Sequence, residues 1–128
     1  MGQIRRFLQN NRGQAMVEFA LVLPVLLLIL GAIIEYGRVF NETLTVTAAA
    51  REGARAAAVG DDGPATALGF AAAIDRGKLT ATVAPAAPVR GQPVTVTVSN
   101  KVPITVPVIS VILGDSVTVS GTATMRTE

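Results

Sequence analysis

The sequence contains no cysteine, no histidine and no tryptophan, and its only aromatic residues are four phenylalanines and one tyrosine. Without cysteine the chain has neither a disulfide framework nor a thiolate metal site. Without histidine it lacks the usual general base near neutral pH and the commonest metal ligand. So few large side chains support only a small hydrophobic core. We therefore expect no cofactor or metal, and the absences disfavour an enzyme.

The charge distribution argues against a nucleic-acid partner. The formal net charge is +2 and the sequence pI is about 9.7. Arg5, Arg6 and Arg12 precede a long apolar run, whereas from Gln14 onward eight basic residues are set against nine acidic ones. A nucleic-acid surface needs a basic patch on the folded domain, and here the basic character is confined to the N-terminal tail.

The apolar run itself predicts a membrane anchor. Residues 19–34 (FALVLPVLLLILGAII) contain no charged side chain, and at about 1.5 Å per residue they extend roughly 24 Å as a helix. Extension back to Gln14 gives enough length to cross a hydrocarbon core of about 30 Å. Pro24 lies inside the run, where membrane helices tolerate proline. We predict a transmembrane helix over residues 14–35, with the preceding arginines on the cytoplasmic side.

A cleavable secretory signal is the competing interpretation, because a basic segment before an apolar one fits both. The apolar run is longer than the usual signal core, and residues 35–38 (EYGR) do not form a small-x-small cleavage site. We therefore expect a single-pass protein of the cytoplasmic membrane whose C-terminal domain is extracytoplasmic.

Glu18 is an unusual residue for the start of such a helix. A carboxylate inside an apolar membrane helix costs on the order of 2–3 kcal/mol. One interpretation is that its side chain extends to the cytoplasmic interface. The other is that Glu18 has a partner that is present only after assembly.

The segment Arg12-Gly13-Gln14-Ala15-Met16-Val17-Glu18-Phe19 resembles a type IV prepilin processing site. The resemblance implies cleavage by a prepilin peptidase after Gly13, which makes Gln14 the mature N-terminus and places Glu18 and Phe19 at the fifth and sixth mature positions. Cleavage would remove the leading arginines and create a free α-amine. The Glu18 carboxylate of one subunit can pair with the amine of a neighbour, and such a pair fixes register more than it adds stability.

More specifically, the chain resembles the TadE-like pseudopilins of tight-adherence pili. The similarity runs over residues 12–60, through RGQAMVEFALVLPVLLLILGAIIEYGRVF and TAAAREGARAAAVG, and resumes weakly over residues 115–126 (DSVTVSGTATMR). It implies a minor or accessory subunit that works with a pilus assembly platform and its ATPase, with other pilin-like subunits and with the lipid bilayer.

The residues after the span favour a continuing helix. Seven alanines between residues 48 and 58 have high helix propensity, although residues 43–47 (TLTVT) alternate like a strand. Arg51, Glu52 and Arg55 form either a contact surface for neighbouring subunits or a solvated helix face. The small residues are compatible with helix–helix packing and with a helix lying on a sheet.

The remaining chain predicts a small sheet. Residues 60–64 (GDDGP) read as a turn, followed by a short helix from Pro64 to about Ile74. Residues 79–83, 94–99 and 117–125 alternate apolar and polar side chains as strands do. Residues 102–113 are apolar but contain two prolines, so we expect a loop that packs under the stalk or lies on the membrane.

The predicted fold is therefore α+β and pilin-like, with a long transmembrane and stalk helix, a short helix and a small antiparallel sheet. The expected parts are a basic leader (1–13), the transmembrane helix (14–35), a helical stalk (36–60) and an extracytoplasmic domain (61–128).

The leading functional hypothesis is a pilin-like structural or accessory subunit. The alternative is an unprocessed single-pass scaffold or binding protein with an extracytoplasmic domain. An enzyme is the weakest hypothesis, because candidate nucleophiles and acids have no histidine and no spaced partner. Those candidates are Ser99, Ser110, Ser116, Ser120, Asp61, Asp62, Asp75 and Asp115.

Overall fold

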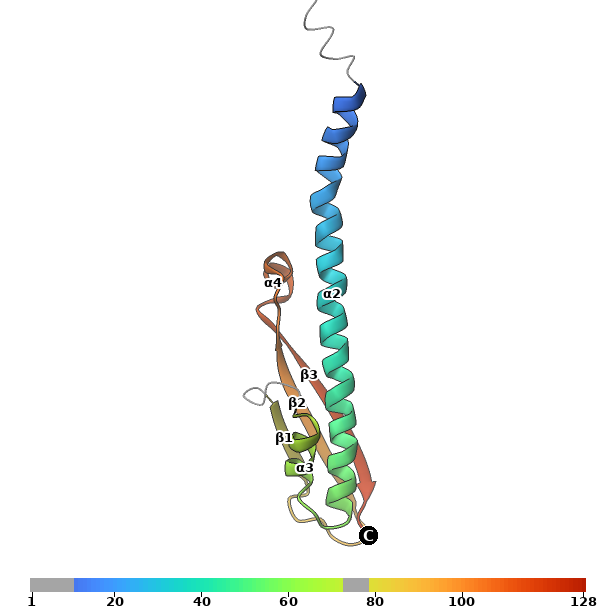
Figure 1. The fold of residues 1–128 in the computed structure, drawn as a ribbon. Coiled ribbons are helices and arrows are strands. Elements are labelled where there is room, and N and C mark those ends of the chain that lie inside the picture. Colours follow the sequence, from blue (N-terminus) through green and yellow to red (C-terminus); the bar gives the residue numbers. More distant parts are fainter. Residues whose placement is uncertain (1–10, 73–78) are drawn as a thin grey trace, which may run out of the picture. The chain divides into compact units, whose positions relative to one another are not determined.

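The computed structural model describes residues 11–72 and 79–128 (Figure 1). The three strands form one antiparallel sheet in the order β1-β2-β3. The long apolar helix, a short helix and this sheet confirm the predicted α+β, pilin-like fold. The elements are α2 (Asn11–Ala58), α3 (Gly63–Phe70), β1 (Leu79–Ala84), β2 (Pro93–Pro103), α4 (Pro107–Leu113) and β3 (Ser116–Arg126).

The chain divides into two compact units, Met1–Ile34 and Glu35–Glu128, and the boundary falls within α2. In the first unit, none of residues 13–34 is buried. Every hydrophobic core residue that the structure describes lies in the second unit. The arginines of the expected leader at positions 5 and 6 lie outside the described residues.

Helix α2 continues through residues 43–47, where the alternating sequence left helix and strand open. Three threonine hydroxyls donate to carbonyl oxygens four residues earlier: Thr43 to Val39 at 2.8 Å, Thr45 to Asn41 at 2.9 Å and Thr47 to Thr43 at 2.7 Å. These bonds satisfy the hydroxyl groups within the helix. Packing of residues 43–47 as part of the helix therefore prevails over their local strand-like pattern.

The core of the second unit is built from small side chains. Its largest fully buried residues are all valines. The alanines of α2 pack on one face of the sheet together with α3, so the stalk alanines serve helix-on-sheet packing. The core members are Val46, Ala49, Ala50, Ala54, Ala57, Ala58, Ala67, Ala71, Leu79, Val94, Val96, Val98, Val102 and Val119.

Two glycines let backbones approach within this core. A Cβ at Gly121 of β3 would lie 2.5 Å from Cα and 2.6 Å from N of Thr47 in α2. A Cβ at Gly53 would lie 2.8 Å from the carbonyl oxygen of Gly63 and 2.9 Å from the Cβ of Ala67. Because these distances are too short for a side chain, α2 can approach β3 this closely only with glycine at position 121, and α3 only with glycine at position 53.

Strand β2 shows why the sheet has two different faces. Val94, Val96, Val98 and Val102 are fully buried and Asn100 is 3% exposed, whereas Thr95, Thr97, Ser99 and Lys101 are partly or fully exposed. The exposed face is rich in hydroxyls, and Thr95 and Thr124 bond across strands at 2.8 Å. Such cross-strand pairs stabilise a sheet that is covered on only one side.

The turn between the two helices is present as predicted. Gly60 adopts a φ of 88° after the end of α2, and the amide of Ala65 donates to the Asp62 carboxylate at 2.9 Å. Asp62 is thus the N-cap of α3, a structural role that needs no bound cation. The predicted helix end at Ile74 lies outside the described residues; α3 ends at Phe70.

The apolar segment between β2 and β3 differs from the predicted loop, because it forms the helix α4. Pro107 is at the helix start, where its missing N–H and fixed φ are compatible with a helix. Gly114, with φ of 84°, follows the last residue. Pro103 ends β2 and Pro107 begins α4, so neither proline prevents regular structure.

Candidate membrane-insertion and assembly site

The first unit has the composition and exposure of a membrane span. Among the described residues, one helix is long and apolar enough to cross a membrane, Gly13–Ala58, and no residue of its apolar window is buried. Leu21, Leu27 and Ile33 are each more than half exposed. A water-exposed helix of this kind would be very unfavourable, so this part of the chain fits a single-pass membrane protein.

At the start of this helix, the structure brings two of the predicted site residues together. The side-chain amide of Gln14 donates to the Glu18 carboxylate at 3.1 Å, one turn apart on α2. Phe19 is 62% exposed, and a Cβ built on Gly13 has no atom within 4 Å. The Gln14 side chain as a partner of Glu18 was missed, although the i, i+4 spacing could have revealed it.

Three charged residues of the stalk, Arg51, Glu52 and Arg55, lie away from the core. Arg51 and Arg55 are exposed, and Glu52 is partly exposed. The Arg55 Nε lies 3.8 Å from Glu52 Oε2, whereas neighbouring Gly53 and Ala54 face the core and are buried. Both a solvated face and a subunit-contact surface agree with this arrangement.

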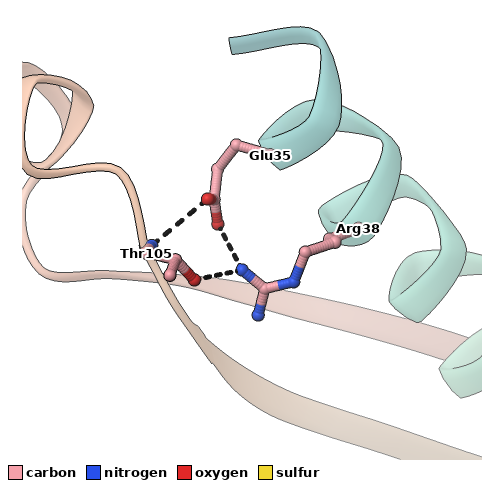
Figure 2. Close-up of polar contacts among 3 residues, drawn as sticks. All are labelled: Glu35, Arg38 and Thr105. Atoms are coloured by element: carbon pink, nitrogen blue, oxygen red, sulfur yellow. Dashed lines mark hydrogen bonds and ion pairs between the residues drawn. The ribbon is translucent and has the colours of Figure 1, made fainter. Parts of the chain in front are cut away.

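A polar cluster that sequence reasoning missed lies where the second unit begins (Figure 2). Glu35 is only 4% exposed. Its carboxylate accepts from Arg38 Nη1 at 2.9 Å and from the backbone N–H of Thr105 at 3.2 Å. Arg38 Nη1 also donates to the Thr105 hydroxyl. The cluster thereby ties α2 to the connection between β2 and α4.

A second polar contact joins α2 to the sheet. The Asn100 side-chain amide donates to Glu42 Oε2 at 2.5 Å, and Asn100 is 3% exposed. Glu35 and Glu42 are two helical turns apart, so they lie on one face of α2. The spacing of the two glutamates was visible in the sequence, but their partners lie 70 and 58 residues away.

Three of the candidate nucleophiles and acids, Ser99, Ser110 and Asp62, have side-chain hydrogen bonds within the fold. The hydroxyls of Ser99 and Thr80 are 2.8 Å apart across β1 and β2. Ser110 donates to the Pro107 carbonyl within α4 at 2.8 Å, and Asp62 caps α3. Asp75 lies outside the described residues. In the described part of the chain, no three His, Cys, Asp or Glu side chains gather as metal ligands do.

The model of the TadE-like protein family matches residues 13–55. The chain carries a TadE-like segment. The match covers about a third of the chain and confirms the resemblance over these residues; it does not include the weak C-terminal similarity at residues 115–126. No curated protein and no solved structure matches the chain.

The TadE-like family is associated with pilus assembly, and this chain resembles it over residues 13–55. The family is one of structural subunits, not of enzymes. The matched region contains the apolar helix, the Gln14–Glu18 contact, Glu35 and the Arg51–Arg55 stretch.

Proposed function

We propose that this protein is a pseudopilin of a tight-adherence pilus, inserted with its N-terminus in the cytoplasm and cleaved by a prepilin peptidase between Gly13 and Gln14. The mature subunit is then extracted from the cytoplasmic membrane by an ATP-driven assembly platform. It contributes to the filament or its biogenesis through lateral contacts of its apolar helix.

The observation that carries this proposal is the combination of an exposed apolar helix with one carboxylate at its N-terminal end. Burial against sister helices would cover the apolar side chains when the subunit leaves the lipid. The family match also begins at residue 13, the glycine that precedes the proposed cut. Gly13 is exposed, which is compatible with access by a peptidase.

The Gln14–Glu18 contact fits a subunit in which Glu18 gains a charged partner only on assembly. A neutral amide satisfies only part of the hydrogen-bonding capacity of a carboxylate. After cleavage, the α-amine of a neighbouring subunit can supply the opposite charge, and a charge-assisted bond is about twice as strong as a neutral one. Glu18 would thus set the register between adjacent helices.

The first test is the intact mass and N-terminal sequence of the full chain recovered from membranes that contain a prepilin peptidase. We expect the wild-type chain to begin at Gln14. Gly13→Val should remain inserted and uncleaved, because a branched side chain obstructs approach to the scissile bond. Gly37→Val is the matched control, since a Cβ at either glycine has free space around it; this variant should be cleaved normally.

A wild-type chain that keeps Met1 in the presence of active peptidase would favour the alternative, an unprocessed membrane scaffold. A start beyond Ile34 would show that the apolar run is a secretory signal. Normal maturation of Gly13→Val would place the processing site elsewhere.

The assembly role of Glu18 is tested with Glu18→Gln and Glu18→Ala. Both variants should be inserted and cleaved but fail to co-assemble with pilin-like subunits, measured by the amount recovered in sheared filaments or cross-linked complexes. Glu18→Gln keeps a neutral hydrogen-bonding group one turn from Gln14. Normal assembly of Glu18→Gln would show that the negative charge is not required.

A further inference from the structure

Helix α4 exposes an apolar surface that the fold does not cover. Val111, Ile112 and Leu113 are 86%, 78% and 60% exposed, and none of the seven residues of the helix is buried. No charged residue occurs between Val102 and Gly114. An exposed apolar segment without charges marks a surface that is covered by another component.

The position of α4 in the second unit is fixed by the Glu35 cluster. Thr105, two residues before α4, bonds to Glu35 through its backbone N–H. Glu35 is the first residue after the apolar run, which ends at Ile34. The amide of Ile104, directly after β2, donates at 2.9 Å to the carbonyl of Asp115, directly before β3, and this bond closes the base of the segment. The α4 segment is therefore anchored to the residue that directly follows the apolar run.

Neighbouring residues of α2 have the character of a membrane interface. The Tyr36 and Phe40 rings are stacked, with centroids 6.2 Å apart, and are 71% and 52% exposed. The side chain of Arg38 is 41% exposed. Aromatic rings gather at the level of lipid headgroups, and arginine side chains extend to phosphate there.

We propose that α4 is a second membrane contact, which inserts its apolar side chains at the headgroup–acyl boundary of the extracytoplasmic leaflet. A short apolar helix at an interface binds lipid through its buried apolar area. A protein partner fits less well, since a stable interface involves about 20–30 residues on each side, and α4 has seven. This proposal depends on the membrane span alone and not on cleavage at Gly13 or on assembly.

The chain contains no tryptophan, so a single introduced tryptophan reports on its own surroundings. We would place the full-length V111W variant in phosphatidylcholine vesicles, with and without bromine on the acyl chains near the headgroup. Because Val111 is 86% exposed, the substitution leaves the core intact. Emission should be blue-shifted and should fall at least about two-fold in brominated vesicles, as expected for insertion of ~5–10 Å.

The matched control is V59W. Val59 is 60% exposed and lies 24 residues after Glu35, roughly 36 Å along the helix at ~1.5 Å per residue. Its emission should be water-like and insensitive to bromine. The same water-like emission from V111W would overturn the proposal. So would emission from V111W that is blue-shifted, insensitive to bromine and dependent on the protein-to-lipid ratio, because a second copy of the chain would then cover α4.

Discussion

Two stretches of α2 hold the helix to the same sheet in different ways. Residues 35–42 do so with polar contacts. Glu35 accepts from Thr105, just after β2, and Glu42 accepts from Asn100, near the C-terminal end of β2. Residues 46–58 do so by close approach of small side chains, and the approach is tightest where Gly121 of β3 faces Thr47. Alanine-lined packing supplies many weak contacts over an area, whereas each carboxylate supplies a few directional ones.

Each stretch contains a glutamate–arginine pair at i, i+3 spacing, and the pairs differ in environment. The Glu35 side chain is 5% exposed, its ion pair with Arg38 measures 2.9 Å, and it also accepts from Thr105. The Glu52 side chain is 42% exposed, and its pair with Arg55 measures 3.8 Å. Two ion pairs with equal spacing in the sequence therefore contribute differently to stability, because only the Glu35 pair is buried and shares its carboxylate with Thr105.

The largest effect is expected where the backbones are closest. In Gly121→Ala the new methyl group would lie 2.5 Å from Thr47 Cα, so α2 must move away from β3. Overpacking against backbone should cost about 3 kcal/mol or more, a large part of the stability of a small domain. Hydrogen–deuterium exchange of the full chain in detergent should show lost protection in β2 and β3.

Gly69→Ala is the matched control for this substitution. Gly69 lies in α3, is exposed, and has no atom within 4 Å of a built Cβ. Alanine should leave exchange unchanged or slow it, by up to about 1 kcal/mol of added stability. Equal exchange in the two variants would show that the close approach at Gly121 contributes nothing.

A smaller and more local effect is expected for Glu35→Ala. The substitution leaves the Thr105 N–H and the Arg38 guanidinium without their shared acceptor, which should cost about 1–3 kcal/mol. Exchange should accelerate at residues 104–106, while amides of the alanine-packed part of β2, around Val96, stay protected. Unchanged exchange at Thr105 would mean that the polar cluster does not hold the connection to α4.

Much of this architecture follows from local patterns. The alternation of valine and threonine in β2 and the run of alanines near Ala54 are period and propensity signals, and they predicted the sheet and the helix. At the candidate site, the position of Glu18 before the apolar run was equally visible. The contact of Glu35 with Thr105 was not visible in the sequence, because Thr105 is 70 residues away and no local rule connects the two residues.

Two differences arose from residues with more than one structural use. Proline was interpreted as a breaker of the segment before β3, but Pro107 begins α4, where a missing N–H costs nothing. The alternating threonines at 43–47 suit a strand locally, yet the valine among them, Val46, is fully buried against the sheet within a helix. In both cases tertiary context selects between local alternatives.

The smallest effect is expected at the exposed pair. Arg55→Ala removes an ion pair of 3.8 Å whose side chains are 72% and 42% exposed, so the free energy of unfolding should change by less than about 0.5 kcal/mol.

The same variant tests the second interpretation of this surface. If Arg51 and Arg55 contact neighbouring subunits, Arg55→Ala should keep wild-type exchange in β2 yet be depleted from cross-linked assemblies, and a solvated face predicts no depletion. A loss of stability above about 1 kcal/mol would contradict the contrast with Glu35, because an exposed pair would then carry as much weight as a buried one.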